Sequence, residues 1–78
     1  MEKKMTEHDL ADILDSLFTV TDDLHAGTDL ARYIQDSIDL GELLAVAKER
    51  HGVTVSKVEL FKTHSQFSDV LLILNNEL

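Results

Sequence analysis

The sequence predicts an all-α protein, a small bundle of three longer helices plus one short helix, with a long packed loop between helices one and two. In three segments apolar residues recur at spacings of three and four, the period of an amphipathic helix. The best extended pattern, Val53-Thr54-Val55, is too short to found a sheet. The connections after helix two are short, which favours a compact bundle.

The size and composition of the chain indicate one domain. Its 78 residues are enough for a single small domain, residues 1–78, with one core. The residues are 44% hydrophobic but include only three Phe, one Tyr and no Trp, so the core must consist of Leu, Ile and Val. Because there is no cysteine, a disulfide scaffold and a thiolate metal site are both excluded.

The net charge of −8 limits the classes of partner. Nucleic acids and anionic membrane surfaces attract Lys and Arg, so neither is an expected partner. The first five residues are not followed by an apolar run, so we expect no signal peptide and no membrane insertion. The sequence predicts a soluble, cytoplasmic, acidic monomer that meets basic patches on other proteins.

Helix one is expected from Glu7 to Phe18. Thr6 and Asp9 have the spacing of a capping box, with Asp in the place usually taken by Glu or Gln. Met5 and Leu10 stand at the two positions of a hydrophobic staple. The apolar stripe of the helix consists of Leu10, Ile13, Leu14 and Leu17 at helical spacing.

The segment from Thr19 to Asp36 is long for a loop in so small a domain. It contains Gly27, which is typical of a turn, and a short helical turn is expected near Asp29 to Tyr33. Five apolar residues indicate that the loop packs over the bundle: Val20, Leu24, Leu30, Tyr33 and Ile34.

Helix two is expected from about Ile38 to His51, with Ser37 as its N-cap. Asp36 and Asp39 add negative charge at the positive end of the helix dipole. The core stripe consists of Leu40, Leu43, Leu44 and Ala47, and the last turn is basic, with Lys48, Arg50 and His51 before Gly52.

Two further helices complete the chain. Ser56 and Glu59 have the spacing of a capping box and predict a short third helix that ends at Thr63. Thr63 or Ser65 is expected to cap the last helix. The apolar period of that helix is held by Phe67, Val70, Leu71, Leu74 and Leu78.

The sequence does not predict an enzyme. Ser37 has no base within helical reach, because Leu40 and Gly41 stand three and four residues later. Asp22, Asp23 and His25 lack the spacing of a calcium loop, so no dedicated metal site is expected. The four histidines lie in four separate segments: His8, His25, His51 and His64.

One segment resembles a known family. Asp36-Ser37-Ile38-Asp39, then Gly41-Glu42-Leu43-Leu44 and a helix ending at His51-Gly52, is similar to the Asp-Ser-Leu segment of acyl and peptidyl carrier proteins. Chain length, acidity and helix order extend the resemblance over nearly all 78 residues. It implies that Ser37 carries a covalent 4′-phosphopantetheine arm, taken from coenzyme A, and that the arm holds acyl intermediates as thioesters. It also implies as partners a phosphopantetheinyl transferase and acyl-loading and acyl-transfer enzymes with basic docking surfaces.

A surface for these partners is expected around Ser37, on the face of helix two opposite its core stripe. Its residues are Asp36, Ile38, Asp39, Gly41, Glu42 and Ala45. Gly41 and Ala45 have small side chains, so this face projects little from the helix and is called the low face. Related carriers tend to have larger apolar residues there. We therefore expect partners to approach the helix closely.

Two departures from the family indicate a specialised carrier rather than one that serves the ordinary fatty acid synthase. Carriers often have a Gly shortly before the Asp-Ser pair, but here the run is Tyr33-Ile34-Gln35. Helix two of carriers is commonly acidic throughout, whereas Lys48 and Arg50 interrupt it here. The expected cargo belongs to a polyketide, aminoacyl, or surface-polysaccharide or lipid biosynthesis pathway. The alternative is an acidic helical protein-protein interaction module without a prosthetic group, and only the fate of Ser37 separates the two hypotheses.

Overall fold

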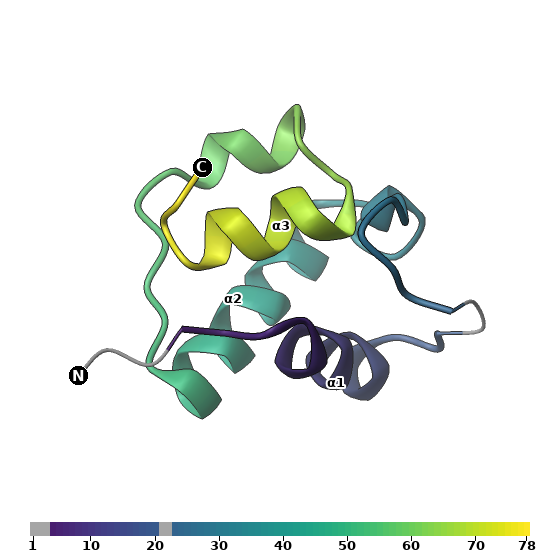
Figure 1. Ribbon diagram of the computed structural model, residues 1–78, viewed down its shortest axis with the longest axis horizontal. Coiled ribbons are helices and arrows are strands. Elements are labelled where there is room, and N and C mark those ends of the chain that lie inside the picture. The colour runs from purple at the N-terminus through teal and green to yellow at the C-terminus, as the bar shows by residue number, and fades with distance from the viewer. Residues whose placement is uncertain (1–3, 21–22) are drawn as a thin grey trace.

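A computed structural model describes residues 4–20 and 23–78 and confirms the predicted fold class (Figure 1). This part of the chain contains three α-helices and two 3-10 helices, with no regular sheet. In chain order they are α1 (Glu7–Leu17), η1 (Leu30–Arg32), α2 (Ser37–His51), η2 (Val58–Lys62) and α3 (Phe67–Leu74). α1 packs against both α2 and α3, and η2 packs against α3. The long loop between α1 and α2 holds η1, so the short helical turn predicted there is also confirmed.

The start of α1 is held by its own side chains, as predicted. The Thr6 hydroxyl accepts the N–H of Asp9 at 3.2 Å, and the Asp9 carboxylate accepts the N–H of Thr6 at 3.0 Å. The bond from the Thr6 N–H holds the pKa of Asp9 below its usual value. Met5 and Leu10 are both buried, so the hydrophobic staple is present too.

The end of α2 also follows the prediction. Gly52 has a left-handed backbone, with φ 68°, and its N–H donates to the carbonyl of Lys48 at 2.9 Å. A residue with a side chain would be strained in this conformation, which explains why a glycine ends the helix.

The caps predicted for η2 and α3 are wrong. Ser56 does not open a capping box, because its N–H and hydroxyl both reach the Asn76 side-chain oxygen, at 3.3 and 3.2 Å. η2 begins after Lys57 without a side-chain cap. Neither Thr63 nor Ser65 caps α3, whose N-cap is Gln66, also without a side-chain bond. At Ser56 a tertiary contact with Asn76 replaces the local capping bond. At the start of α3 no side-chain cap forms.

The loop between α1 and α2 supplies the acceptors that α3 lacks. The N–H of Phe67 donates to the Thr28 carbonyl at 2.7 Å, and the N–H of Ser68 donates to the Ala26 carbonyl at 3.1 Å. These are orphan donors of the first turn, which every helix must satisfy from outside itself. The loop is therefore joined to the bundle by its backbone.

The core draws on all three α-helices and on the loop. Leu30 of the loop is fully buried, which confirms that this segment packs down on the bundle. Other buried residues include Leu10, Ile13, Leu14, Leu43, Ala47, Phe67, Val70, Ile73 and Leu74. Leu40, Leu44 and Leu71 of the predicted stripes are only partly buried, and Leu78 lies beyond the end of α3. Ile73 is also buried, although the predicted apolar period of the last helix does not include it.

The two ends of the described chain are tied together. Asn75, just after α3, accepts the N–H of Met5 at 2.8 Å through its side-chain oxygen and donates to the Met5 carbonyl at 3.0 Å. Lys4 and Glu77 form an ion pair next to it.

No helix in residues 4–20 and 23–78 is long and apolar enough to span a membrane.

Candidate functional site

Ser37 is the first residue of α2 and is exposed, but it is not the N-cap of the helix. The cap is Asp36, whose carboxylate oxygen Oδ1 accepts the N–H groups of Ile38 and Asp39, both at 3.0 Å. Asp and Ser are about equally good caps. The extended backbone of Asp36 places its side chain over the helix start, and a charged acceptor makes the stronger bonds.

The capping role of Asp36 changes the chemistry that Ser37 can perform. A capping serine would have its hydroxyl oxygen engaged with the backbone. Here that task falls to Asp36, and none of the hydrogen bonds formed among the described residues involves the Ser37 hydroxyl. The hydroxyl is thus exposed and uncommitted. It forms no hydrogen bond with a histidine, so an external enzyme would have to activate it.

A second carboxylate braces the same helix start. Asp39 accepts the N–H of Gln35 at 3.1 Å and is partly buried. Asp36 and Asp39 therefore each have a structural task, besides any part in partner recognition. Glu42 is exposed and makes no such bond to a described residue. Of the three predicted acidic recognition residues, Glu42 can be changed with least effect on the fold.

The outward face of α2 is arranged as the sequence predicted. Ile38 is 70% exposed, the most exposed large apolar side chain among the described residues. Gly41 and Ala45 are exposed as well, and a Cβ atom added at Gly41 would meet nothing within 4 Å. The face is therefore open and low. Its role in partner binding stays a prediction.

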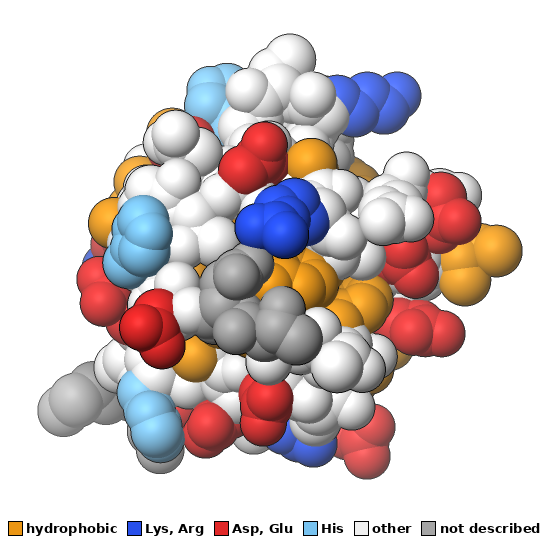
Figure 2. Space-filling model, turned by 90° about the vertical axis from the view of Figure 1, so that its right-hand side faces the viewer, with side chains coloured by type: hydrophobic (Ala, Val, Ile, Leu, Met, Phe, Trp, Pro, Cys, Tyr) orange, Lys and Arg blue, Asp and Glu red, His pale blue; other side chains and the backbone are white. Residues whose placement is uncertain are grey.

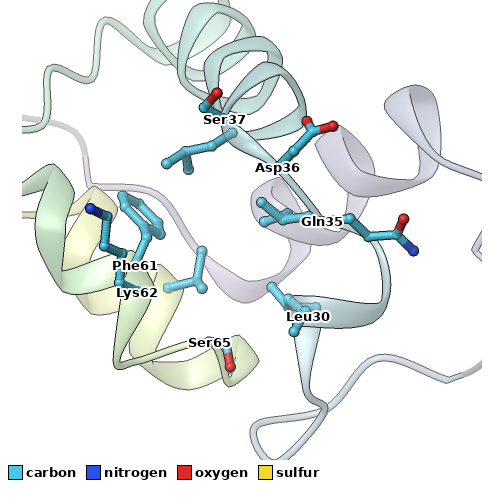
Figure 3. Close-up of a pocket in the computed structure, with 11 residues that line it drawn as sticks. Leu30, Gln35, Asp36, Ser37, Phe61, Lys62 and Ser65 are labelled. Carbon is cyan, nitrogen blue, oxygen red and sulfur yellow. The ribbon is translucent and has the colours of Figure 1, made fainter.

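Ser37 lies on the rim of a cleft of about 370 Å³ (Figure 3). The cleft runs between the segment leading into α2 and η2 with the start of α3. Figure 3 shows Ser37 at one end, Ser65 at the other and Phe61 on a side wall. The apolar lining is Leu30, Ala31, Ile34, Leu40, Phe61 and Val70, and the polar lining is Gln35, Asp36, Ser37, Lys62 and Ser65.

The sequence reasoning did not find this cleft. The only signal for it was the apolar content of the loop, which correctly indicated that Leu30 and Ile34 pack inward. Phe61, Lys62 and Ser65 belong to a segment whose caps were wrongly assigned. No local pattern pairs them with Ser37, because that pairing depends on how η2 packs across the bundle.

The histidines form no second site. His8 pairs with Asp12 at 3.3 Å, and the Nδ1 atom of His25 accepts the N–H of Gly27 at 3.1 Å. The Nδ1 atom of His64 lies 2.8 Å from the Thr63 hydroxyl. The described residues contain no cluster of three or more His, Cys, Asp or Glu suited to a metal ion. Asp22, which stands near Asp23 and His25 in the sequence, lies outside the described residues.

The surface around these elements is acidic without being uniform. Figure 2 shows acidic side chains spread over one face, with apolar side chains visible between them.

The chain matches no protein-family model, no curated protein and no solved structure. The site therefore has to be interpreted from its own geometry.

Proposed function

We propose that this protein is an acyl carrier in which Ser37 holds a 4′-phosphopantetheine arm. The observation that carries the proposal is the exposed, uncommitted Ser37 hydroxyl on the rim of an apolar cleft. When bound, the arm supplies a thiol that carries an acyl group as a thioester. The chain itself contributes the attachment atom, a rigid helix beside it and a surface for partner enzymes, and it performs no catalysis of its own.

The residues around Ser37 fit such a group. The hydroxyl is accessible to a transferase, and a phosphate joined to it would remain in water. Asp36 already occupies the N–H groups of Ile38 and Asp39, so the helix start would not hold the phosphate through them. Repulsion from the two carboxylates is weakened by the exposure of the site, because solvent and salt screen such charges.

The cleft suits the apolar part of a cargo. Six apolar side chains line it, and its volume of about 370 Å³ is at the low end of the roughly 300–1,000 Å³ typical of small-ligand sites. The departures from the carrier pattern favour a specialised cargo from a polyketide, aminoacyl, or surface-polysaccharide or lipid pathway.

The intact mass of the protein tests the attachment. After incubation with coenzyme A and a broad phosphopantetheinyl transferase, the wild type should gain the mass of one arm. Ser37→Ala should gain none, because the attacking hydroxyl is missing. Ser65→Ala is the matched control, since it removes a serine at the opposite end of the same cleft, and it should still be modified.

Two results of this experiment would contradict the proposal. If Ser37→Ala is modified like the wild type, the attachment site is elsewhere. If the folded wild type is not modified, the acidic protein-protein interaction module without a prosthetic group becomes the better hypothesis.

The proposed partners are a phosphopantetheinyl transferase and acyl-transfer enzymes with basic docking surfaces, which the acidic surface would steer toward α2. Glu42→Lys should slow modification at low salt much more than at high salt, because exposed charges are screened beyond about 8 Å at physiological ionic strength. Glu7→Lys at the start of α1 is the control with the same change in net charge. A modification rate that responds equally to both changes would exclude steering toward α2.

The low face of α2 is proposed to bind the dedicated acyl-transfer enzymes. Gly41→Val and Ala45→Met should leave the protein folded, since both positions are exposed. They should weaken transfer to these enzymes more than modification by a general transferase. Unchanged transfer by both variants would show that the face is not a recognition surface.

A further inference from the structure

The start of α2 supplies no positive side chain to an anionic group joined to Ser37. Its charged side chains are the carboxylates of Asp36 and Asp39. The N–H groups of Ile38 and Asp39, which could otherwise bind an anion at a helix start, already donate to Asp36. A positive partner for such a group must therefore come from another element of the fold.

Lys62, the last residue of η2, is placed to supply this charge. Lys62 and Ser37 line the same cleft of about 370 Å³. Figure 3 shows Ser37 at one end of the cleft and Lys62 next to Phe61 on the side wall. Among the described residues that line the cleft, Lys62 has the only positive side chain and Asp36 the only negative one. The cleft is small for a ligand site, so one small group can span the distance between its walls.

The amine of Lys62 is available for such a contact. It is exposed and forms no hydrogen bond or ion pair with a described residue. The amine of Lys57, at the start of η2, instead donates to the Leu78 carbonyl at 3.5 Å. Lys48 and Arg50 stand near the far end of α2, roughly 16–20 Å along the helix from its start. Lys62 is therefore the uncommitted cation that shares the cleft with the attachment serine.

We propose that Lys62 is a positioning residue for an anionic group attached to Ser37: its ammonium attracts the phosphate and draws the first atoms of the group toward η2. An ammonium and a phosphate form a charge-assisted hydrogen bond, and the flexible stem of Lys lets its three donors follow the phosphate. Solvent weakens an exposed pair, so Lys62 directs the group without holding it tightly. The inference rests on the proposed function for the identity of the group as phosphopantetheine.

The electrostatic potential at position 37 tests the proposal. Because the chain has no cysteine, Ser37→Cys provides a unique thiol there. Its thiolate attacks the sulfur of a methanethiosulfonate reagent, a disulfide forms, and methanesulfinate leaves. One reagent carries a sulfonate group and the other a trimethylammonium group. The ratio of the anionic to the cationic rate constant reports the potential, because a change in the thiolate fraction affects both rates equally and cancels.

Removing the charge of Lys62 should lower this ratio. In the Ser37→Cys protein at 0.1 M salt, Lys62→Gln should lower it by about two- to fourfold, since charges closer than the Debye length of about 10 Å still interact. Lys62→Arg keeps the positive charge and should keep the ratio. Lys48→Gln is the matched control, because it makes the same change in net charge beyond the Debye length. It should change the ratio by less than about 1.3-fold.

An equilibrium measurement checks that the anion stays near Lys62 once it is attached. The equilibrium constant of unfolding is measured in urea for the sulfonate adduct and for the trimethylammonium adduct of the Ser37→Cys protein. Lys62→Gln should raise this constant for the sulfonate adduct, relative to the trimethylammonium adduct, by about 1.4- to 5-fold, the range for an exposed ion pair.

Three results would overturn the proposal. Equal changes of the rate ratio in Lys62→Gln and Lys48→Gln would mean that only net charge matters. A ratio as low in Lys62→Arg as in Lys62→Gln would mean that the charge of Lys62 is not the cause. Equal effects of Lys62→Gln on the two adducts would mean that the attached anion does not meet Lys62. No transferase takes part in these measurements, so they are independent of whether the native Ser37 is phosphopantetheinylated, which the mass experiment decides separately.

Discussion

The first turns of α1 and α3 both need acceptors for N–H groups that have no partner within the helix, and they obtain them in two different ways. At α1, Thr6 and Asp9 hold each other's backbone N–H groups within one four-residue segment. At α3, the N–H groups of Phe67 and Ser68 are held by carbonyls of the loop between α1 and α2. The first arrangement is local and can be read from residue types. The second depends on the tertiary fold, so α3 and the loop are expected to lose structure together.

The largest effect should come from breaking the contact between the loop and α3. Leu30→Ala removes a fully buried side chain of the loop and should lower the free energy of unfolding by about 2–5 kcal/mol. Leu10→Ala in α1 is the control for a regular core helix, and the two losses should be similar. Urea denaturation measures both. A loss below about 1 kcal/mol for Leu30→Ala would mean that the loop is not part of the core.

A smaller effect should distinguish Asp36 from Ser37. Asp36→Ala removes the cap of α2 and should lower the free energy of unfolding by about 0.5–2 kcal/mol. Ser37→Ala should change it by no more than about 0.5 kcal/mol, because the exposed serine holds no backbone group. Thermal unfolding of the two variants gives the comparison. The reverse order would restore Ser37 as the cap.

A new local cap on α3 should have less effect still. Replacing a residue without a capping bond by serine at an N-cap normally stabilises a protein by about 1 kcal/mol. Gln66→Ser should gain less than about half of this, because the N–H of Ser68 already donates to the loop. Thr6→Ala at α1 should show the full loss of about 0.5–2 kcal/mol. A full gain from Gln66→Ser would show that the loop carbonyls contribute little to α3.

The smallest effect should be a loss of stability at acidic pH. The pKa values of Asp9 and Asp29 are both held below the usual 3.8, in each case chiefly by a backbone N–H. A depressed carboxyl pKa gives stability that is complete above the unfolded pKa and is lost as the pH falls through the folded pKa. The difference in stability between the wild type and Asp9→Asn or Asp29→Asn should therefore be constant above about pH 5 and should shrink below about pH 4. Urea midpoints across this pH range measure it.

The sequence was sufficient for the features that depend on neighbouring residues. The Thr6–Asp9 capping box, the Gly52 helix end and the helical turn at Leu30–Arg32 all depend on contacts within a few positions. The wrong caps at η2 and α3 share a physical cause. Ser56 and Ser65 have residue types that suit a cap, but a partner distant in sequence competes for each hydroxyl, Asn76 for Ser56 and Asp29 for Ser65.

In the candidate site too, local features could be predicted and features that depend on tertiary packing could not. The position and exposure of Ser37 follow from the helix start, although the capping role was assigned one residue too late. Asp36 and Ser37 are adjacent residues with similar capping tendencies, so only the backbone conformation could decide between them. The cleft could not be predicted, since its walls come from the loop, α2, η2 and α3 and exist only once these pack together.

Asp36 caps α2 and the Ser37 hydroxyl does not, and this division of roles has a thermodynamic consequence. A group that forms no hydrogen bond on folding can be removed with little effect on the folding equilibrium, and by reciprocity folding leaves its intrinsic reactivity little changed. The Ser37 hydroxyl is such a group, because it makes no hydrogen bond to the helix backbone or to a described side chain. An enzyme that modifies this serine only in the folded protein must therefore obtain its selectivity from the surrounding surface.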